Sequence, residues 1–302
     1  MQIHRSEMGM VVQAPAKLNL FFEVLGKRAD GYHEIETLMC PVDLYDTIWF
    51  REEPGGRIRL SYGEVSGFWR PNRTWLSEVP DGPANLIVRA VELLQRRAGV
   101  PSGAELRLVK RIPTAAGLGG GSSDAAAALV AANAGWRLDW SMSQLSELAG
   151  ELGSDVPFFL ANRPAICRGR GEQVEPLTGL GELHFVIVRP PQGLSTRDVY
   201  QACRPAAQPR RLAPLLGAFA SGDGKRMGGL LFNRLQPAAE SLSPWIDRLR
   251  RKFTEMDCLG HGMSGSGTSY FGLCRHARHA LRVARRLLSC GVGSVFAVRS
   301  CR

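Results

Sequence analysis

A glycine-rich segment contains the first residues whose types and spacing could do chemistry. It runs from Pro113 to Ser123 and is followed directly by an alanine-rich stretch typical of a helix. Glycine leaves the backbone open to close approach by a ligand, and the first N–H groups of a helix have no partner within that helix. The helix dipole adds partial positive charge at the same end, so the segment could bind phosphate groups.

Two familiar phosphate-binding motifs are excluded by counting. A dinucleotide-binding fingerprint that starts at Gly117 needs glycine where Ser122 stands, and one that starts at Gly119 needs glycine where Asp124 stands. A Walker loop needs a lysine after its last glycine, and none follows here. We expect Ser122 or Ser123 to cap the helix or to direct a hydroxyl at a phosphate or its metal ion. A strand-to-helix turn without a ligand is the alternative interpretation.

A second glycine-rich turn covers residues 262–269 and precedes the apolar stretch 270–274. Hairpins and bulges use the same residue types, so this turn alone is weaker evidence for a ligand. Together, the two glycine-rich segments predict two backbone surfaces that close on one ligand.

Polar side chains interrupt apolar stretches at two further places. Lys17 and Asn19 lie in a predicted strand and share one of its faces, because side chains alternate along a strand. Lys17 is either the guard of an edge strand or a charge placed for chemistry. Asp155 precedes Pro157 and an apolar run, a pattern that by itself favours a helix cap over a catalytic role.

Aromatic and histidine residues offer fewer candidates. Tyr32 and His33 follow a predicted turn, where they could stack on and hydrogen-bond a planar ligand or be exposed turn residues. His276 and His279 stand three apart, and we interpret them as solvated helix residues in preference to a metal pair.

Strands and helices interleave without a regular β-α alternation, which predicts an α+β fold with two lobes joined near residues 160–175. Residues 51–83 are loop-rich, and we expect a surface excursion there that contains Phe68, Trp69 and Trp75. The predicted strands cover residues 11–26, 37–50, 103–113, 184–190 and 270–274. The predicted helices cover residues 84–97, 122–133, 141–152, 243–256 and 275–290.

The last predicted helix, residues 275–290, is amphipathic. We expect a solvated basic face, in preference to a nucleic-acid site, because no aromatic residues interleave with its arginines. Its basic face comprises Arg275, Arg278, Arg282, Arg285 and Arg286. Its apolar face comprises Ala277, Leu281, Ala284, Leu287 and Leu288.

Composition limits the class of protein. With 302 residues, 44% of them hydrophobic and 22% charged, the sequence is that of an ordinary globular protein and excludes disorder, collagen and coiled coil as its main state. No stretch predicts a membrane span or a signal peptide. Seven widely spaced cysteines without a CxxC motif favour a reducing cytosol, so we expect a cytoplasmic protein. A net charge of +10 favours anionic partners.

Four segments, in this order and at these spacings, resemble the GHMP kinase superfamily. They are PAKLNLFFEVLGKRADGYHEIETL (15–38), GLGGGSSDAAAAL (117–129), GSDVPFFL (153–160) and GMSGSGTSYF (262–271). The resemblance covers most of the chain and is weakest over residues 200–255. It implies a two-lobed GHMP-kinase-like fold, with a mixed-sheet, ATP-binding and catalytic domain over residues 1–165 and an α+β domain over residues 166–302.

The resemblance also implies a reaction. Within the superfamily, the segments with Lys17 and with Tyr32-His33 point to ATP-dependent phosphorylation of the 2-hydroxyl of a CDP-linked methylerythritol, in the non-mevalonate route to isoprenoid precursors. Lys17 and Asp155 take the catalytic positions, Asp155 as general base and Lys17 as charge stabiliser. Asn19, Tyr32 and His33 take positions near the substrate.

ATP and Mg²⁺ are the implied cofactors, with Ser123 as a metal ligand. The implied ATP-binding residues are Pro113, Thr114, Ala115, Ala116, Gly117, Leu118, Gly119, Gly120, Gly121, Ser122 and Ser123. Ala115 and Ala116 depart from the glycine-richer form of the family, so we expect a differently shaped phosphate cradle.

The expected partner is a small CDP-linked substrate, with no nucleic acid and no membrane; a monomer and a homodimer both stay open. Two alternatives remain from the sequence. One is another GHMP kinase that acts on a different alcohol. The other is a nucleotide-binding or nucleic-acid-binding protein without catalysis, which the positive charge permits.

Overall fold

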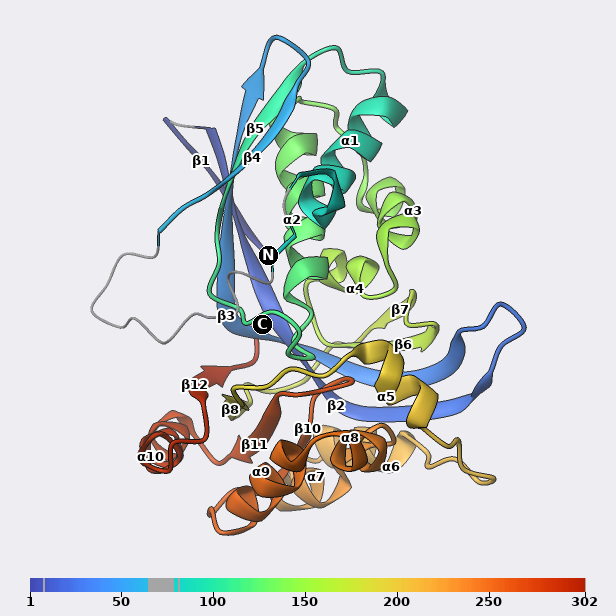
Figure 1. Ribbon diagram of the computed structural model, residues 1–302, viewed down its shortest axis with the longest axis vertical. Helices are drawn as coiled ribbons and strands as arrows, with labels where there is room; N and C mark the ends of the chain where they lie inside the picture. The colour runs from blue at the N-terminus through green and yellow to red at the C-terminus, as the bar shows by residue number, and fades with distance from the viewer. Residues whose placement is uncertain (8, 65–78, 81, 302) are drawn as a thin grey trace. The chain divides into compact units, whose positions relative to one another are not determined.

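The computed structural model describes residues 1–7, 9–64, 79–80 and 82–301 (Figure 1). The chain forms two compact units, and neither is one continuous stretch. The first unit comprises Met1–Ala16, Leu44–Thr114 and Gly119–Asn162. The second comprises Lys17–Asp43, Ala115–Leu118 and Arg163–Arg302. The chain passes between the compact units several times, so these units do not test the predicted domain boundary at residue 165. That boundary stays a prediction.

Two long strands contribute residues to both units. They are β2 (Gly9–Lys27) and β3 (His33–Glu53). The predicted strands over residues 11–26 and 37–50 are confirmed, and each extends further than predicted. The turn that joins them contains the predicted residues 29–31.

The first unit contains further strands and helices besides its parts of β2 and β3. Its further elements are β1 (Gln2–Ser6), β4 (Ile58–Tyr62), a 3₁₀ turn (Gly82–Ala84), α1 (Leu86–Ala98), β5 (Gly103–Val109), α2 (Gly120–Gly135), α3 (Met142–Leu152) and α4 (Val156–Ala161). Strand β1 pairs antiparallel with the start of β2, and β5 pairs antiparallel with the end of β3 and parallel with β4. Figure 1 shows the four α-helices gathered on one side of β4 and β5.

Capping residues explain where these helices begin and end. Asn85 accepts a backbone hydrogen bond at 2.9 Å and caps α1, and Gly99 ends that helix with φ 65°. Ser141 and Gln144 form a reciprocal capping box at the start of α3. The predicted helices over residues 84–97 and 141–152 are therefore confirmed.

Strand β4 corrects the prediction for residues 51–83. That segment is not only loop, because Ile58–Tyr62 pairs parallel with β5. Ile58, Leu60 and Tyr62 alternate with Arg59 and Ser61, which is the pattern of a strand, but the glycine and proline residues around this short segment favoured the loop prediction. Phe68, Trp69 and Trp75 lie outside the described residues.

The second unit contains an antiparallel sheet in the order β10-β11-β8-β12, formed by β8 (His184–Arg189), β10 (Gly260–Met263), β11 (Tyr270–Cys274) and β12 (Ser294–Arg299). Its shorter strands are β6 (Ala165–Gly169), β7 (Gln173–Pro176) and β9 (Phe232–Asn233). Strand β6 pairs with the start of β3, and β9 pairs with β2. The helices are α5 (Thr196–Ala202), α6 (Ala213–Ala220), α7 (Gly224–Leu230), α8 (Gln236–Leu242), α9 (Pro244–Thr254) and α10 (Ala277–Ser289). The mixture of helices and sheets confirms the predicted α+β class.

One hydrophobic core joins the hairpin of the second unit to its helices. Phe22, Val24 and Ile35 from β2 and β3 pack in one cluster with apolar residues of α8, α9 and α10. Helices α9 and α10 contact the four-stranded sheet. Because Phe22 and Val24 face this core, the residues between them and beside them on β2 face the opposite side of the hairpin.

The predicted solvated basic face of helix α10 is confirmed, and the predicted apolar face is confirmed only in part, since Ala284 and Leu287 are buried. Leu281 and Leu288, predicted on the apolar face, are 52% and 46% exposed, whereas His279 is 2% exposed. The interpretation of His279 as a solvated residue is therefore wrong. His276 is exposed and caps the helix, accepting a hydrogen bond from the N–H of His279 at 3.1 Å. Within the described residues, no helix has the length and apolar character needed to cross a membrane.

Candidate active site

Lys17 lies on β2 in the second unit and is 4% exposed. Its Nζ donates a hydrogen bond to Oδ1 of Asn19 at 2.5 Å, and Nδ2 of Asn19 donates to Oγ1 of Thr37 at 2.8 Å. Thr37, on β3, donates in turn to the carbonyl oxygen of Phe21 at 2.6 Å. This chain of hydrogen bonds orients a buried ammonium. The guard of an edge strand has to reach solvent, so the burial of Lys17 argues against that interpretation, and its role in chemistry stays a prediction.

The middle of the first glycine-rich segment packs against the second glycine-rich turn. Oγ of Ser264 donates to the carbonyl oxygen of Gly117 at 3.0 Å. The N–H of Ser269 donates to the carbonyl oxygen of Ala116 at 3.0 Å. The prediction that the two glycine-rich backbones come together is confirmed. The ligand that they bind stays a prediction.

Two positions in these segments, Gly117 and Gly265, require glycine. Gly117 has φ 72°, and a Cβ atom there would lie 2.1 Å from the carbonyl oxygen of Ser264. Gly265 has φ 56°, and its Cβ would lie 3.2 Å from Nζ of Lys17. The N–H of Lys17 donates to the carbonyl oxygen of Leu118 at 2.9 Å. We call Lys17, Asn19, Thr37 and the two backbones packed against them the Lys17 cluster.

Asn233 on β9 shapes the second turn. Its Nδ2 donates to the carbonyl oxygens of Met263 and Gly265, each at 2.8 Å, and its Oδ1 accepts from the N–H of Leu235 at 2.9 Å. The sequence left the role of Asn233 open, since its partners are about thirty positions away. Its buried side chain therefore fixes the backbone that lies beside Lys17.

Both glycine-rich segments carry buried hydroxyl groups without a hydrogen-bond partner. Thr268 and Ser269 in the second turn are fully buried, and Oγ1 of the first and Oγ of the second lack a partner within the described residues. Ser123, in the first turn of α2, has the same property. A buried hydroxyl without a partner costs free energy, so these positions fit a polar ligand.

Helix α2 begins earlier than predicted. Gly119 is the N-cap, with φ 69°, and Gly120 is the first helical residue. Ser122 and Ser123 lie inside the helix, so the prediction that one of them caps it is wrong. The glycines at the start of the helix allow its backbone to approach other groups closely, since a Cβ on Gly120 would lie 2.8 Å from Nζ of Lys110.

A buried ionic cluster in the first unit escaped the sequence analysis. Lys110 donates from Nζ to Oδ2 of Asp124 at 2.8 Å and also to Oδ2 of Asp46. Asp46 fixes the start of the glycine-rich segment, because its Oδ1 accepts from the N–H groups of Arg111 and Ile112. We call these three charged residues the Lys110 cluster. The sequence signal for the Lys110 cluster was Asp124, a carboxylate within the alanine-rich helix.

Burial and neighbouring charge shift two pKa values in the Lys110 cluster. Burial disfavours the ammonium of Lys110, but Asp124 and Asp46 outweigh this effect and raise its pKa. Burial raises the pKa of Asp124 well above its ordinary range; Lys110 opposes this shift and Asp46 adds to it. Oδ1 of Asp124 is buried without a hydrogen-bond partner within the described residues. The proton of this carboxyl is therefore held more tightly in the folded protein.

Asp155 stands at the N-cap position of α4, in the first unit, and is half-buried. Its position agrees with the capping interpretation, but its side chain makes no capping hydrogen bond. Pro157 lies in the first turn of α4, as predicted. Asp155 and Lys17 belong to different compact units, and their joint action stays a prediction.

Tyr32 and His33 lie at the turn between β2 and β3. Tyr32 is 53% exposed, and the guanidinium of Arg170 lies 4.9 Å from its ring centroid. The ring of His33 lies 5.1 Å from the ring of Tyr200 on α5, measured between centroids. Tyr200 therefore joins the predicted pair as a third ring residue, which no sequence motif marked. Partial burial and the charge of Lys27 lower the pKa of His33.

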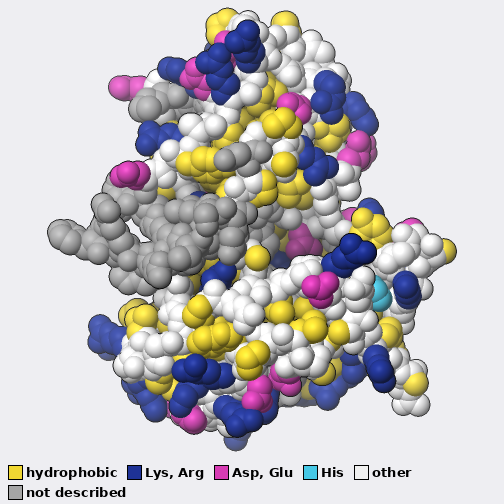
Figure 2. Space-filling view, in the orientation of Figure 1, with side chains coloured by type: hydrophobic (Ala, Val, Ile, Leu, Met, Phe, Trp, Pro, Cys, Tyr) yellow, Lys and Arg dark blue, Asp and Glu magenta, His cyan; other side chains and the backbone are white. Residues whose placement is uncertain are grey.

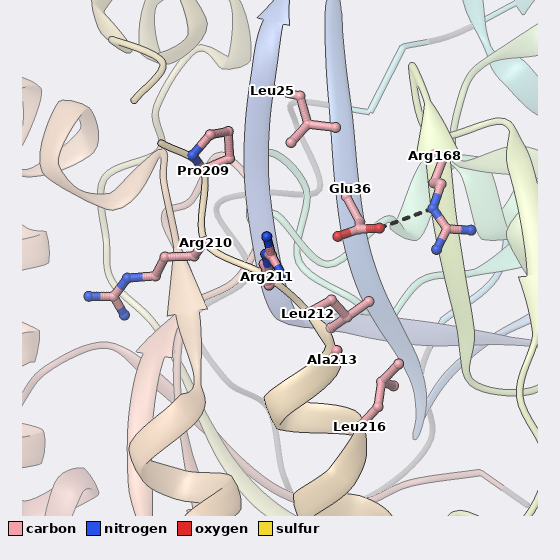
Figure 3. A pocket seen from close by; sticks show the side chains of 9 residues that line it. All are labelled: Leu25, Glu36, Arg168, Pro209, Arg210, Arg211, Leu212, Ala213 and Leu216. Carbon is pink, nitrogen blue, oxygen red and sulfur yellow. Dashed lines mark hydrogen bonds and ion pairs between the residues drawn. The ribbon is translucent and has the colours of Figure 1, made fainter. Parts of the chain in front are cut away.

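A cavity of about 340 Å³ lies on the other face of the hairpin (Figure 3). Leu25 and Glu36 point into it, and Glu36 pairs there with Nε of Arg168 at 3.0 Å. The predicted site residues are not among its lining side chains. The remaining lining residues are Pro209, Arg210, Arg211, Leu212, Ala213 and Leu216.

Away from the predicted site residues, the surface carries charges of both signs. On the face shown in Figure 2, Lys and Arg side chains are interspersed with Asp and Glu. Arg275, just before α10, and Arg282, on α10, both form ion pairs with Asp257. Among the residues that the structure describes, no group of three or more His, Cys, Asp or Glu side chains could hold a metal ion.

Comparison with protein families identifies two matching domains. The GHMP kinases N terminal domain matches residues 85–163, and the GHMP kinases C terminal domain matches residues 215–293.

Two curated relatives carry the same name. The 4-diphosphocytidyl-2-C-methyl-D-erythritol kinase of Pelotomaculum thermopropionicum is 43% identical over 281 residues, which cover 92% of this chain and 94% of the relative. The enzyme of that name from Gloeobacter violaceus is 38% identical over 276 residues, which cover 89% of this chain and 87% of the relative.

Solved structures agree with these sequence matches. A crystal structure of 4-(cytidine 5'-diphospho)-2C-methyl-D-erythritol kinase, 36% identical in sequence, superposes with a TM-score of 0.79 over 97% of this chain and 100% of that chain. Homoserine kinase from Cytophaga hutchinsonii superposes with a TM-score of 0.73 at 18% identity, over 99% of this chain and 96% of that chain. The second match concerns the fold alone, and the predicted GHMP-kinase-like fold is confirmed.

Proposed function

The chain belongs to the 4-diphosphocytidyl-2-C-methyl-D-erythritol kinases of the GHMP kinase family, and from this premise we propose its full reaction. It is an ATP-dependent small-molecule kinase. In our proposal it transfers the γ-phosphoryl group of ATP to the 2-hydroxyl of 4-diphosphocytidyl-2-C-methyl-D-erythritol. The product would serve the non-mevalonate route to isoprenoid precursors.

The observation that carries the proposal is the Lys17 cluster, in which two glycine-rich backbones pack together beside a buried lysine. Phosphoryl transfer depends on positioning and on neutralisation of charge, with little covalent chemistry for the protein to do. Backbone N–H groups in a glycine-rich segment and an oriented ammonium can supply both for a polyphosphate.

The buried hydroxyl groups support a phosphate ligand at these segments. Thr268, Ser269 and Ser123 would each gain a hydrogen-bond partner or a metal ion when ATP binds. We propose that the whole segment from Pro113 to Ser123 binds the phosphates of ATP. Ala115 adopts φ 47°, so an alanine there does not prevent the left-handed backbone that glycine usually supplies.

We assign the general base to Asp155 and charge stabilisation to Lys17. A tertiary alcohol is a weak acid, so its attack on a phosphoryl group needs a base in reach. Asp155 suits this role because its carboxylate is half-buried and is not used to cap α4. Lys17 would stabilise negative charge that develops on the attacking oxygen.

Asn19 and Thr37 act in this proposal as positioning residues. Asn19 is 1% exposed, and its amide group bonds both to Lys17 and to Thr37. Its side chain therefore acts on the substrate through the orientation of Lys17. An amide oxygen orients an ammonium group without cancelling its charge.

Ser123 is the proposed protein ligand of Mg²⁺. Its Oγ is buried in the first turn of α2 and has no hydrogen-bond partner within the described residues, which fits a metal ligand. When bound, Mg²⁺ would neutralise charge on the ATP phosphates.

We propose that Tyr32, His33 and Tyr200 recognise the cytosine end of the substrate. Aromatic rings stack on a planar base, and the neutral imidazole of His33 offers one donor and one acceptor to its edge. The lowered pKa of His33 favours that neutral form. Binding energy from the remote base would help to orient the reacting hydroxyl.

The test is coupled ADP release with ATP, Mg²⁺ and three acceptors: the CDP-linked substrate, homoserine and mevalonate. We expect turnover with the CDP-linked substrate only. Asp155→Asn should lower kcat about 10²–10⁴-fold, because it removes the base, while ATP still binds. The matched control is Asp139→Asn, since Asp139 is exposed and its φ of 54° suits asparagine.

Other outcomes would redirect the assignment. Full turnover by Asp155→Asn would remove Asp155 from the mechanism but keep the kinase. Absence of turnover by folded wild-type protein with the CDP-linked substrate would contradict the substrate, and turnover with another alcohol would identify a different GHMP kinase. Absence of ADP release with every alcohol tested, joined to steeply salt-dependent binding of DNA or RNA, would favour the binding-protein hypothesis.

A further inference from the structure

Cys258 and Cys274 form a thiol pair in the second unit, outside the groups that the kinase reaction uses. Cys258 lies two residues before the first residue of β10, and Cys274 is the last residue of β11. The two strands pair antiparallel with Gly260 opposite Leu273, and the N–H of Leu259 donates to the carbonyl oxygen of Leu273 at 2.8 Å. Continuing this register puts Leu259 opposite Cys274, so Cys258 lies one position from the residue that faces Cys274.

The two sulfur atoms converge on Gly272. A Cβ atom on Gly272 would lie 2.7 Å from Sγ of Cys258, and Sγ of Cys274 lies 3.9 Å from the carbonyl oxygen of Gly272. The two thiols lie close enough for each to shift the pKa of the other. Gly272 lacks a side chain at the point where Cys258 enters, so the missing side chain makes room for the thiol contact.

The two thiols differ in access and in acidity. Cys258 is half-buried, whereas Cys274 is 3% exposed. The neighbouring thiol of Cys274 lowers the pKa of Cys258, although burial opposes this, and the charge of Arg275 adds to the lowering. The thiol of Cys258 in turn raises the pKa of Cys274, and burial adds to that shift. Cys258 is therefore the thiol with more thiolate character and with access to a reagent in solution.

We propose that Cys258 and Cys274 are a redox-sensitive pair that a hydroperoxide converts into an intrachain disulfide. The Cys258 thiolate attacks the outer peroxide oxygen, so that an S–O bond forms, the O–O bond breaks and the alcohol leaves with a proton. The sulfur of Cys274 then attacks the sulfur of the Cys258 sulfenic acid, so that the S–S bond forms and the S–O bond breaks. The hydroxide leaves as water with the Cys274 proton. Sulfur loses two electrons in total, and the peroxide gains them.

The position of the bond gives it a structural consequence. The segment enclosed by the two cysteines, residues 259–273, contains the whole glycine-rich turn over residues 262–269. A disulfide would tie together the start of β10 and the end of β11, the two strands that lead into and out of that turn.

The test exposes full-length reduced protein to limiting hydrogen peroxide, followed by alkylation of the remaining thiols and peptide mass spectrometry. We expect wild-type protein to lose the mass of two hydrogen atoms, with one linked peptide pair that contains Cys258 and Cys274. Cys274→Ser should instead accumulate a sulfenic acid at Cys258 that dimedone traps. Cys258→Ser should show neither product at this pair.

Cys290 provides the matched control, because it is also half-buried but its Sγ bonds to the carbonyl oxygen of Arg286. Cys290→Ser should leave the disulfide yield of the pair unchanged. The proposal is contradicted if wild-type Cys258 and Cys274 both stay reduced while other cysteines are oxidised. It is also contradicted if wild-type Cys258 stops at sulfenic or sulfinic acid without forming the bond to Cys274.

Discussion

Two buried lysines donate hydrogen bonds to different kinds of group within their own units. Lys110, in the first unit, bonds to two buried carboxylates, whereas the hydrogen bond of Lys17 within the second unit goes to the neutral amide of Asn19. Carboxylates compensate the charge of a lysine and tie it to the fold, but an amide only orients it. The comparison teaches that burial alone does not mark a lysine for chemistry, and we propose that the type of its partners does.

Removal of Lys110 should produce the largest loss of stability. Lys110→Met leaves the carboxylates of Asp46 and Asp124 buried without their cation, so the free energy of unfolding should fall by about 3–5 kcal/mol. Urea unfolding measures this loss. Lys17→Met, which removes the donor to the neutral amide of Asn19, should cost less. Equal losses for the two variants would contradict the contrast between the clusters.

Removal of the Thr37 hydroxyl should affect both stability and activity. Thr37→Val leaves Nδ2 of Asn19 buried without its acceptor, which should cost about 1–3 kcal/mol of unfolding free energy. Since Asn19 orients Lys17, kcat for ADP release should also fall about tenfold. This corresponds to about 1.4 kcal/mol of lost transition-state stabilisation.

The matched control for Thr37→Val lies on the same strand. Thr47→Val removes another buried threonine hydroxyl of β3, one that accepts from Arg111 at 3.2 Å in the first unit. It should lower stability but leave kcat nearly unchanged. A loss of activity as large as that of Thr37→Val would show that the effect is not specific to Lys17.

The Lys110 cluster should also make stability depend on pH. Because the folded pKa of Asp124 is raised, this carboxyl stabilises the fold most at pH values below its ordinary pKa of 3.8 and less as pH rises toward the folded value. Asp124→Asn removes this dependence. The unfolding free energy of the variant minus that of wild type should therefore increase as pH rises from about 4, by at most about 1.4 kcal/mol per pH unit. A difference that stays flat over that range would contradict the raised pKa.

Much of the fold and part of the site could be predicted from local patterns. The alternation of side chains placed Lys17 and Asn19 on one face of a strand, and the hydrogen bond between them confirms it. Glycine and capping residues marked the ends of α1 and α3. The two glycine-rich segments were predicted to meet because both remove side chains where backbones approach closely.

What escaped prediction depends on contacts between distant residues. Lys110 lies 64 positions from Asp46, and no local pattern connects them. Tyr200 reaches His33 only through the packing of α5. Part of the apolar face of α10 was assigned wrongly, because Leu281 and His279 both fit a helical period and packing alone decides which one is buried.

The most direct test of the central claim measures Lys17→Met and wild type side by side for ADP release with the CDP-linked substrate and for urea unfolding. The account predicts that kcat falls about 10²–10³-fold while the variant stays folded, because the oriented charge acts in the transition state. A folded Lys17→Met protein with wild-type turnover would contradict the claim that the Lys17 cluster is the catalytic centre.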